Sequence, residues 1–330
     1  MKLMRKGLSN HAGFSLVELM VAMIIGLFLT LGVFTMFSMS SSNVTTTSQF
    51  NQLQENGRIA LALMERDISQ LGFMGDITGT ELVRGVNTTL LAAIIPTGDD
   101  CIGGGINNAS FPNTTSSHFR KLWGYEAGVG TESLACLTNV VKNTDVIQIK
   151  RLSGPPTTNP NDVNRYYIGA TANQAIIFSG SQPTPTLDNG RFWEYVHHVY
   201  YIQNDGSIPV LRRRLLLNGG MNTSGSYEQL VEGIENMRIL YGFDNDGNDT
   251  ADIFMPAQNV TSLMWDNEQF QRLVAIRIFL LVRSTDEDSS YTNDTKYVLG
   301  DKKIAATQDH FRRKVVSTTI VLENPVLIRQ

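Results

Sequence analysis

An almost uninterrupted hydrophobic segment lies near the start of the chain, from Leu19 to Phe37. As an α-helix it would span about 28 Å at ~1.5 Å per residue, close to the ~30 Å hydrocarbon core of a bilayer. The first 13 residues of the chain contain three basic residues, Lys2, Arg5 and Lys6, and no acid. The pattern predicts a membrane-spanning helix with a cytoplasmic N-terminus, so that the rest of the chain is exported.

A second helical pattern follows a polar stretch. Residues 38–48 are rich in Ser, Thr and Asn, which are poor helix formers, and we expect the helix to loosen there. Apolar residues then recur at helical spacing: Phe50, Leu53, Gly57, Ala60, Leu61, Met64, Ile68 and Leu71. We predict one helix over residues 14–72, with 14–37 in the membrane, a later stripe packed under a globular head, and Gly72 at its end.

The remainder, residues 73–330, is turn-rich and β-biased, which predicts a β-sheet head. The expected strands are 145–152, 166–170, 174–179, 192–203, 208–217, 237–243, 271–283 and 311–323. Asn204-Asp205-Gly206-Ser207 should close a hairpin, and apolar residues on both faces of 271–283 predict a central strand with the helix on one face. Residues 80–135 resemble long loops. The predicted fold class is α+β: a long N-terminal helix packed against a predominantly antiparallel β-sheet head.

The composition excludes several classes of protein. Hydrophobic residues make up 42% of the 330 positions, which excludes a disordered or collagen-like chain. A net charge of −4 gives no general attraction for nucleic acid, although local contact with DNA stays open through two basic runs. These runs are Arg212-Arg213-Arg214 and Arg312-Arg313-Lys314; strand alternation splits each between two faces, which favours solvated strand edges or subunit contacts.

Three interpretations compete for the N-terminal segment. A secretory signal would have a shorter apolar core with a cleavage site such as Ser38-Met39-Ser40, and a plain membrane anchor would explain the length alone. Neither explains Glu18, an acid at the start of the hydrophobic run. A carboxylate at membrane depth costs a few kcal/mol and needs a partner. A functional role for Glu18 therefore has to be part of the answer.

The residues around Glu18 resemble the type III signal of prepilins and pseudopilins. Gly13-Phe14-Ser15-Leu16-Val17-Glu18-Leu19 has the basic leader ending in Gly, then Phe, then Glu at the fifth mature position. The resemblance implies that a prepilin peptidase removes a leader of residues 1–13, cutting between Gly13 and Phe14, and methylates the new amine of Phe14. Glu18 would then pair with that amine on a neighbouring subunit, as an assembly residue.

Segments near the C-terminus resemble the PilW group of minor pilins and define a PilW-like region, 230–330, after a variable region, 73–229. They are Leu230–Glu235, Tyr241–Asp249, Leu273–Arg283 and Phe311–Pro325. The resemblance implies the type IV pilin fold, in a periplasmic or extracellular head that is first anchored in the inner membrane and later lies in the pilus at the cell surface. It also implies help in priming pilus assembly, a place at the tip, and roles in twitching motility, adhesion and DNA uptake.

The same resemblance names the partners: other minor and major pilins, the prepilin peptidase, the inner-membrane assembly platform and a tip adhesin. Two alternatives remain open. A J-type minor pseudopilin of a type II secretion system shares the helix but is usually shorter. A membrane-anchored periplasmic binding protein or enzyme would not need Glu18. The sequence holds no GxxxxGK[ST] loop and no nucleophile–base constellation, so we expect no enzyme.

Two further features concern the head. The two cysteines, Cys101 and Cys136, predict a disulfide in an exported protein, with two free thiols as the alternative. The acidic loop 244–249 suggests calcium, but its spacing rejects an EF-hand. A looser calcium site from Asp244, Asp246, Asn248 and Asp252 remains open beside a plain polar turn, and no other cofactor is expected.

Overall fold

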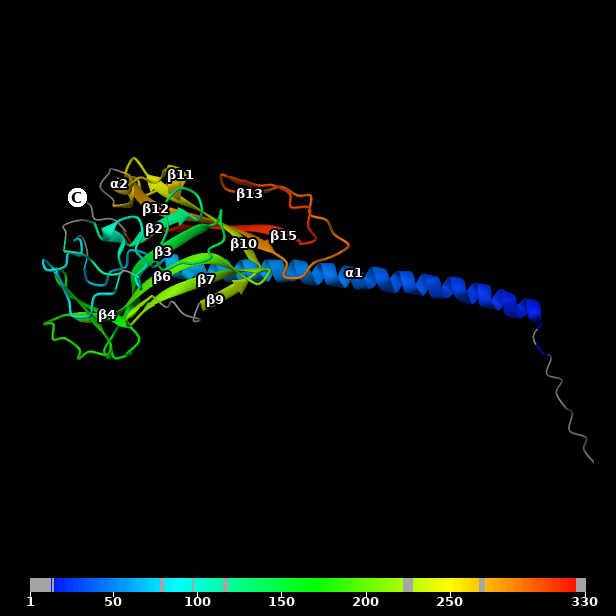
Figure 1. Ribbon diagram of the computed structural model, residues 1–330, viewed down its shortest axis with the longest axis horizontal. Coiled ribbons are helices and arrows are strands. Elements are labelled where there is room, and N and C mark those ends of the chain that lie inside the picture. The colour runs from blue at the N-terminus through cyan, green and yellow to red at the C-terminus, as the bar shows by residue number, and fades with distance from the viewer. Residues whose placement is uncertain are drawn as a thin grey trace, which may run out of the picture. The chain divides into compact units, whose positions relative to one another are not determined.

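A computed structural model describes residues 13, 15–77, 80–96, 98–114, 118–221, 228–266 and 271–324. The chain divides into two compact units, residues 1–51 and 52–330. The first contains most of the long helix α1 (Leu16–Ile68), and the second contains the last turns of α1 and every strand in the described part of the chain (Figure 1).

Helix α1 is continuous through the polar stretch, so the expected loosening at residues 38–48 is wrong. The reason is local. Within this stretch the Thr45 hydroxyl donates a hydrogen bond to the Ser41 carbonyl four residues earlier, so its side chain bonds to the helix itself, as Thr30 and Thr35 do in the segment before it. The helix ends at Ile68, and Gly72 follows in a left-handed conformation at φ 82°, as a helix stop requires.

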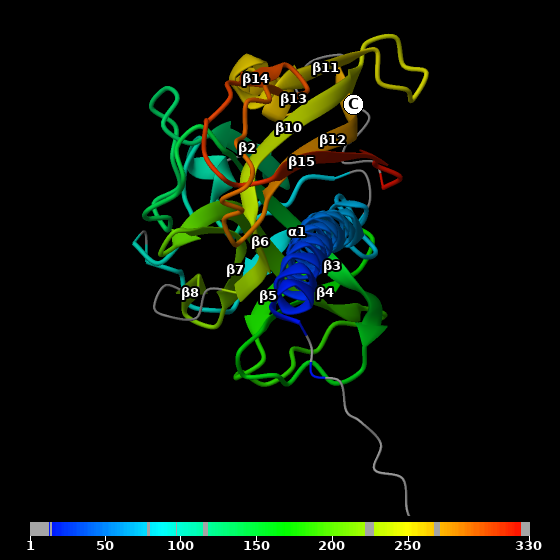
Figure 2. The ribbon, with the colours of Figure 1, turned by 90° about the vertical axis from the view of Figure 1, so that its right-hand side faces the viewer.

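The C-terminal part of α1 packs on the sheets through its predicted stripe, of which Leu53, Ala60, Met64 and Ile68 are fully buried. The helix passes close to the second sheet at Gly57. A Cβ there would lie 3.0 Å from Val316 and 3.1 Å from Val282, so a glycine lets the helix come close to strands β12 and β15 (Figure 2).

The large sheet has nine strands and is mostly antiparallel. Its main order is β1 (Thr88–Leu90), β5 (Ala175–Ser179), β4 (Tyr166–Ala170), β6 (Arg191–Asp205), β3 (Asp145–Thr157) and β2 (Leu122–Glu126). Off this path, β7 (Ile208–Leu217) pairs with β6, β8 (Gly220–Met221) and β9 (Glu228–Glu232). The β6–β7 hairpin confirms the predicted turn, whereas β1 and β2 fall in a region predicted as loops.

The second sheet has four strands in the order β11 (Ile253–Pro256), β10 (Ile234–Asp244), β12 (Arg272–Arg283) and β15 (Arg313–Val321). As predicted, β12 is central. Ile276, Ile278 and Leu280 are fully buried on one face, and on the other face Leu281 packs against the small hairpin of β13 (Tyr297–Leu299) and β14 (Lys302–Ile304). The structure is therefore an α+β fold with a long N-terminal helix on mostly antiparallel sheets.

A disulfide joins Cys101 to Cys136, the pair that the sequence predicted. The loop that it closes carries the 3₁₀ helix η1 (Ile106–Asn108) and the edge strand β2. Two short helical turns, η2 (Ala257–Asn259) and α2 (Ser262–Trp265), follow β11, and η2 contacts β2. This arrangement brings the disulfide-closed loop beside the second sheet.

Candidate assembly interface

The first turn of α1 is closed by a reciprocal pair of hydrogen bonds. The Ser15 backbone N–H donates to Glu18 Oε2 at 2.9 Å, and the Glu18 N–H donates to Ser15 Oγ at 3.2 Å. This is a capping box, with Ser15 as N-cap and the acid three residues later. From the sequence, Glu18 was expected to pair with another subunit. The structure shows that its carboxylate also caps its own helix. Phe14, the residue expected to be methylated, lies outside the described residues.

The helix that follows exposes apolar side chains on all its sides within the first unit. Leu16, Leu19, Ile24, Phe28 and Phe37 are each more than half exposed. Mean hydropathy reaches 2.4 in this part, and in the described chain α1 is the one helix long and apolar enough to cross a membrane. Water does not favour so much exposed apolar surface, and a bilayer or the side chains of other subunits would cover it.

A buried carboxylate fixes the other end of α1 to the head. Asp67 is 3% exposed, and three side chains of the large sheet surround it. Its carboxylate lies 2.6 Å from Arg151 Nη2, 2.6 Å from His198 Nδ1 and 2.6 Å from the Tyr200 hydroxyl. Arg151 also donates from Nη1 to Gln70 Oε1 at 2.7 Å, so β3 holds both the last turn of α1 and the turn that follows it.

The contacts within this cluster shift the pKa values of Asp67 and His198. Burial by itself would raise the pKa of Asp67, but the hydrogen bond from His198 and the charge of Arg151 outweigh it and lower the pKa below the ordinary range. Burial lowers the pKa of His198, against the pull of Asp67. The cluster therefore holds an ionised carboxylate against Arg151 with a neutral histidine beside it.

The sequence analysis missed Asp67, although a signal was present. Asp67 lies three residues after Met64 and four before Leu71, which places an acid on the apolar stripe. An acid is almost never fully buried unless it is paired, so this position predicts a basic partner for Asp67 in the head. Nothing in the sequence pointed to Arg151 as that partner.

The two adjacent histidines of β6 face opposite ways, as strand geometry requires. His198 faces Asp67, whereas His197 Nδ1 lies 2.8 Å from Ser110 Oγ and its Nε2 lies 2.7 Å from Gln148. Both are buried, and they serve two separate hydrogen-bond clusters.

The basic runs are less solvated than expected. Arg214 and Arg313 are buried, which corrects the prediction of solvated strand edges for these two residues. Arg313 pairs with Glu235 and Asp309, and Arg312 pairs with Asp288. The charges of Arg312 and Arg313 are thus compensated by acids of the head.

The acidic loop after β10 folds as a turn held by its own carboxylates. Asp244 Oδ1 accepts N–H bonds from Asp246 and Gly247, and its Oδ2 accepts from the Asp249 N–H and from Arg272 at 3.0 Å. Asp244, Asp246 and Asp252 can place one oxygen each within 4.8 Å of one another, while Asn248 Oδ1 accepts from the Thr250 N–H. These oxygens already stabilise the turn, and calcium binding stays a prediction.

Comparisons with known families bear on both ends of the chain. Residues 8–34 match the family model described as the prokaryotic N-terminal methylation motif, and residues 199–324 match the model described as type IV pilus-assembly protein W, PilW. The C-terminal part of the chain is therefore similar to PilW, a type IV pilus assembly protein, and its N-terminus carries a prepilin-type methylation motif. No curated protein and no solved structure matches it.

The PilW match fits the structure element by element. It begins within β6 and runs through the β6–β7 hairpin and the four-stranded sheet to the end of β15. A PilW-type minor pilin is a structural rather than a catalytic protein. The methylation motif implies processing by a prepilin peptidase and incorporation into a pilus, and the apolar helix that follows is consistent with anchoring in a membrane.

Proposed function

We propose that this PilW-type minor pilin is cut between Gly13 and Phe14, methylated on Phe14, and helps to prime assembly of the type IV pilus. Before assembly it lies in the inner membrane with its head in the periplasm, and afterwards it lies at or near the pilus tip, serving twitching motility, adhesion and DNA uptake. Its partners are other minor and major pilins, the assembly platform and a tip adhesin.

The observation that carries the proposal is the position of Glu18 at the start of an exposed apolar helix. Its Oε2 accepts from Ser15, whereas no described residue donates to Oε1. The second oxygen is thus open to the methylated amine of Phe14 in a neighbouring subunit. Within an apolar filament core such a charge pair is strong, because removing one partner of a buried pair leaves the other uncompensated, at a cost of ~3–5 kcal/mol.

The test separates the two roles of Glu18. Glu18→Gln keeps the capping box, since Gln serves at this position as well as Glu, but removes the charge. Ser15→Ala removes the cap and keeps the charge. We expect Glu18→Gln to reduce surface pili counted by electron microscopy severalfold, and Ser15→Ala to leave them close to the wild-type number.

The mature N-terminus is the control for processing. Mass spectrometry of the wild type and of both variants should find N-methyl-Phe14. Equal piliation of Glu18→Gln and wild type, or an intact Met1 in the assembled protein, would contradict the proposal and favour a membrane-anchored protein with another role.

A further inference from the structure

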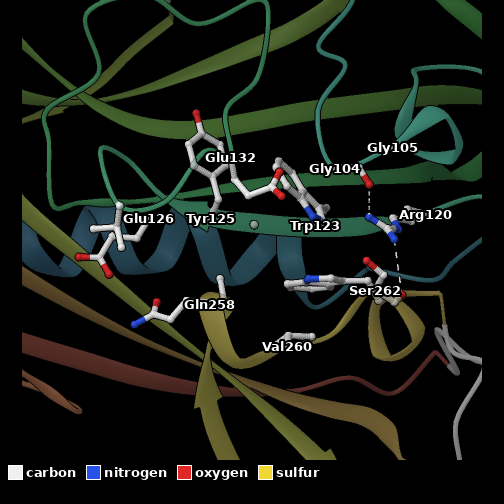
Figure 3. Close-up of a pocket in the computed structure, with 14 residues that line it drawn as sticks. Gly104, Gly105, Arg120, Trp123, Tyr125, Glu126, Glu132, Gln258, Val260 and Ser262 are labelled. Carbon is white, nitrogen blue, oxygen red and sulfur yellow. Dashed lines mark hydrogen bonds between the residues drawn. The ribbon is translucent and has the colours of Figure 1, made fainter.

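A cavity of about 330 Å³ lies between the edge strand β2 and the segment of η2 and α2, within the second unit (Figure 3). Trp123, Gly124 and Tyr125 of β2 form one side, and Val260 and Trp265 form the other. The remaining lining includes Gly104, Arg120 and Glu132. Most of this lining belongs to the disulfide-closed loop, and the opposite wall belongs to the segment that matches PilW.

The backbone of Gly124 borders this cavity without a hydrogen-bond partner. The Lys150 N–H donates to the Lys121 carbonyl, and the Ala127 N–H donates to Thr144. Because paired and unpaired residues alternate in an antiparallel ladder, the main-chain groups of Gly124 point away from β3. In the described part of the chain β2 pairs with β3 alone, and no other described group bonds the Gly124 main chain.

An unpaired and buried main chain is unusual in a folded protein. Gly124 is buried, and over 90% of buried backbone N–H and C=O groups in proteins are paired. A free strand edge presents such groups in the pattern that another strand complements. An extended backbone that adds to β2 would supply the partners that the N–H and C=O groups of Gly124 lack.

The walls of the cavity are held in place before any partner arrives. Arg120 donates to Asp266 and to the Gly104 carbonyl, tying the disulfide-closed loop to the residue after α2. The Trp265 ring packs edge-on against Tyr241, with centroids 4.8 Å apart. A preformed groove lowers the entropic cost of binding a segment.

Charge adds a second requirement. Arg120 is neutralised by Asp266, and Glu126 is neutralised by Arg238 and Lys302. Glu132 is exposed, and among the described residues no cation lies within ion-pair distance of its carboxylate, which Figure 3 shows directed toward Trp123. The cavity thus keeps one uncompensated negative charge.

We infer that an extended segment of another pilus subunit adds to the free edge of β2 in this cavity, pairing with the Gly124 main chain and placing a Lys or Arg side chain against Glu132. Main-chain pairing supplies affinity, and the charge selects the partner segment. The nature of the partner rests on the proposed function, whereas the strand edge and the unpaired carboxylate do not.

The experiment uses the full chain in piliated cells. Benzoylphenylalanine is placed at Val129, which lines the cavity and is 39% exposed, and at Val163, which is 56% exposed and lies outside it. After irradiation we expect Val129 alone to give an adduct, whose cross-linked peptide maps by mass spectrometry to a basic, extended segment of another pilus subunit. Glu132→Lys should lower the adduct yield about tenfold or more, because like charges across an interface repel.

Asp188→Lys is the matched control, since Asp188 is also exposed and lies outside the cavity; its adduct yield should equal that of the wild type. Thermal unfolding of both variants should match the wild type. The inference is overturned by absence of the Val129 adduct in piliated cells, by equal adducts at Val129 and Val163, by an adduct insensitive to Glu132→Lys, or by a small molecule filling the cavity. Detection of N-methyl-Phe14 in the same samples tests processing, and with it the proposed function, independently of the adduct.

Discussion

Two acids of the same helix meet opposite surroundings. Glu18 is exposed at the first turn, where its side chain accepts a hydrogen bond from the Ser15 N–H, whereas Asp67 is buried at the last turn among Arg151, His198 and Tyr200. The sequence drew attention to Glu18 because it interrupts a hydrophobic run. It passed over Asp67 because its neighbours Glu65 and Arg66 made the surroundings look polar.

The Asp67 cluster predicts a large loss of stability on substitution. Asp67→Ala would leave Arg151 buried without a counter-charge, and we expect the free energy of unfolding to fall by about 3–5 kcal/mol. The measurement is denaturant unfolding of the purified chain in detergent, followed by tryptophan fluorescence. Glu65→Ala, at an exposed position of the same helix, should change stability by less than about 0.5 kcal/mol.

The pH dependence gives the same prediction a second readout. Because the folded pKa of Asp67 lies below its unfolded value of about 3.9, its contribution is present above about pH 4 and is lost as the pH falls toward the folded pKa. Stability of the wild type should therefore fall more steeply below about pH 4 than that of Asp67→Asn. Parallel curves would show that Asp67 is not held ionised by Arg151.

At the scale of elements, periodicity predicted type and position well. The apolar stripe from Leu53 to Leu71 and the alternation in β12 were correct because each pattern reflects one repeating geometry. The prediction for residues 38–48 was wrong because a hydroxyl side chain can either compete with the helical hydrogen bonds or bond to a carbonyl of the helix. Thr45 does the second. Strands β1 and β2 were missed because they are short and lie among Gly and Asn residues.

The close contact between α1 and the second sheet predicts that a large side chain at position 57 destabilises the fold. Gly57→Leu would push against Val316 and Val282, and overpacking of this kind costs about 1–3 kcal/mol. The same unfolding measurement checks it. Gly32→Leu on the same helix is the control: nothing lies within 4 Å of a Cβ there, so no loss of unfolding free energy is expected. Equal behaviour of the two variants would mean that the helix does not pack closely at Gly57.

At the scale of the whole molecule, the unmatched middle of the chain completes the head. Strands β3 to β6 precede or span the start of the PilW match, yet β6 continues into it and pairs with β7. Residues of both sheets and of α1 belong to one buried cluster. The region that the sequence left as variable is therefore part of the core.

The disulfide is the covalent link within this region. Replacing Cys101 and Cys136 by Ser opens a loop of sequence separation 35, which by chain entropy should cost about 4 kcal/mol of unfolding free energy. Thermal unfolding should show a lower Tm for the double variant. Reducing agent should lower the Tm of the wild type toward that of the variant and leave the variant unchanged; an unaffected wild type would contradict a stabilising bond.

The sequence by itself determined the long helix, its apolar segment, the processing motif, the principal strands and the cysteine pair, because each is written in neighbouring residues or in a short repeat. Tertiary structure alone decided which polar groups become buried partners. Asp67 meets Arg151 and His198 across 84 and 131 residues, and the main chain of Gly124 has no strand partner among the described residues because β2 is an edge of the large sheet. Such contacts depend on which strands, far apart in the sequence, become neighbours in the sheets. Local sequence patterns do not specify that order.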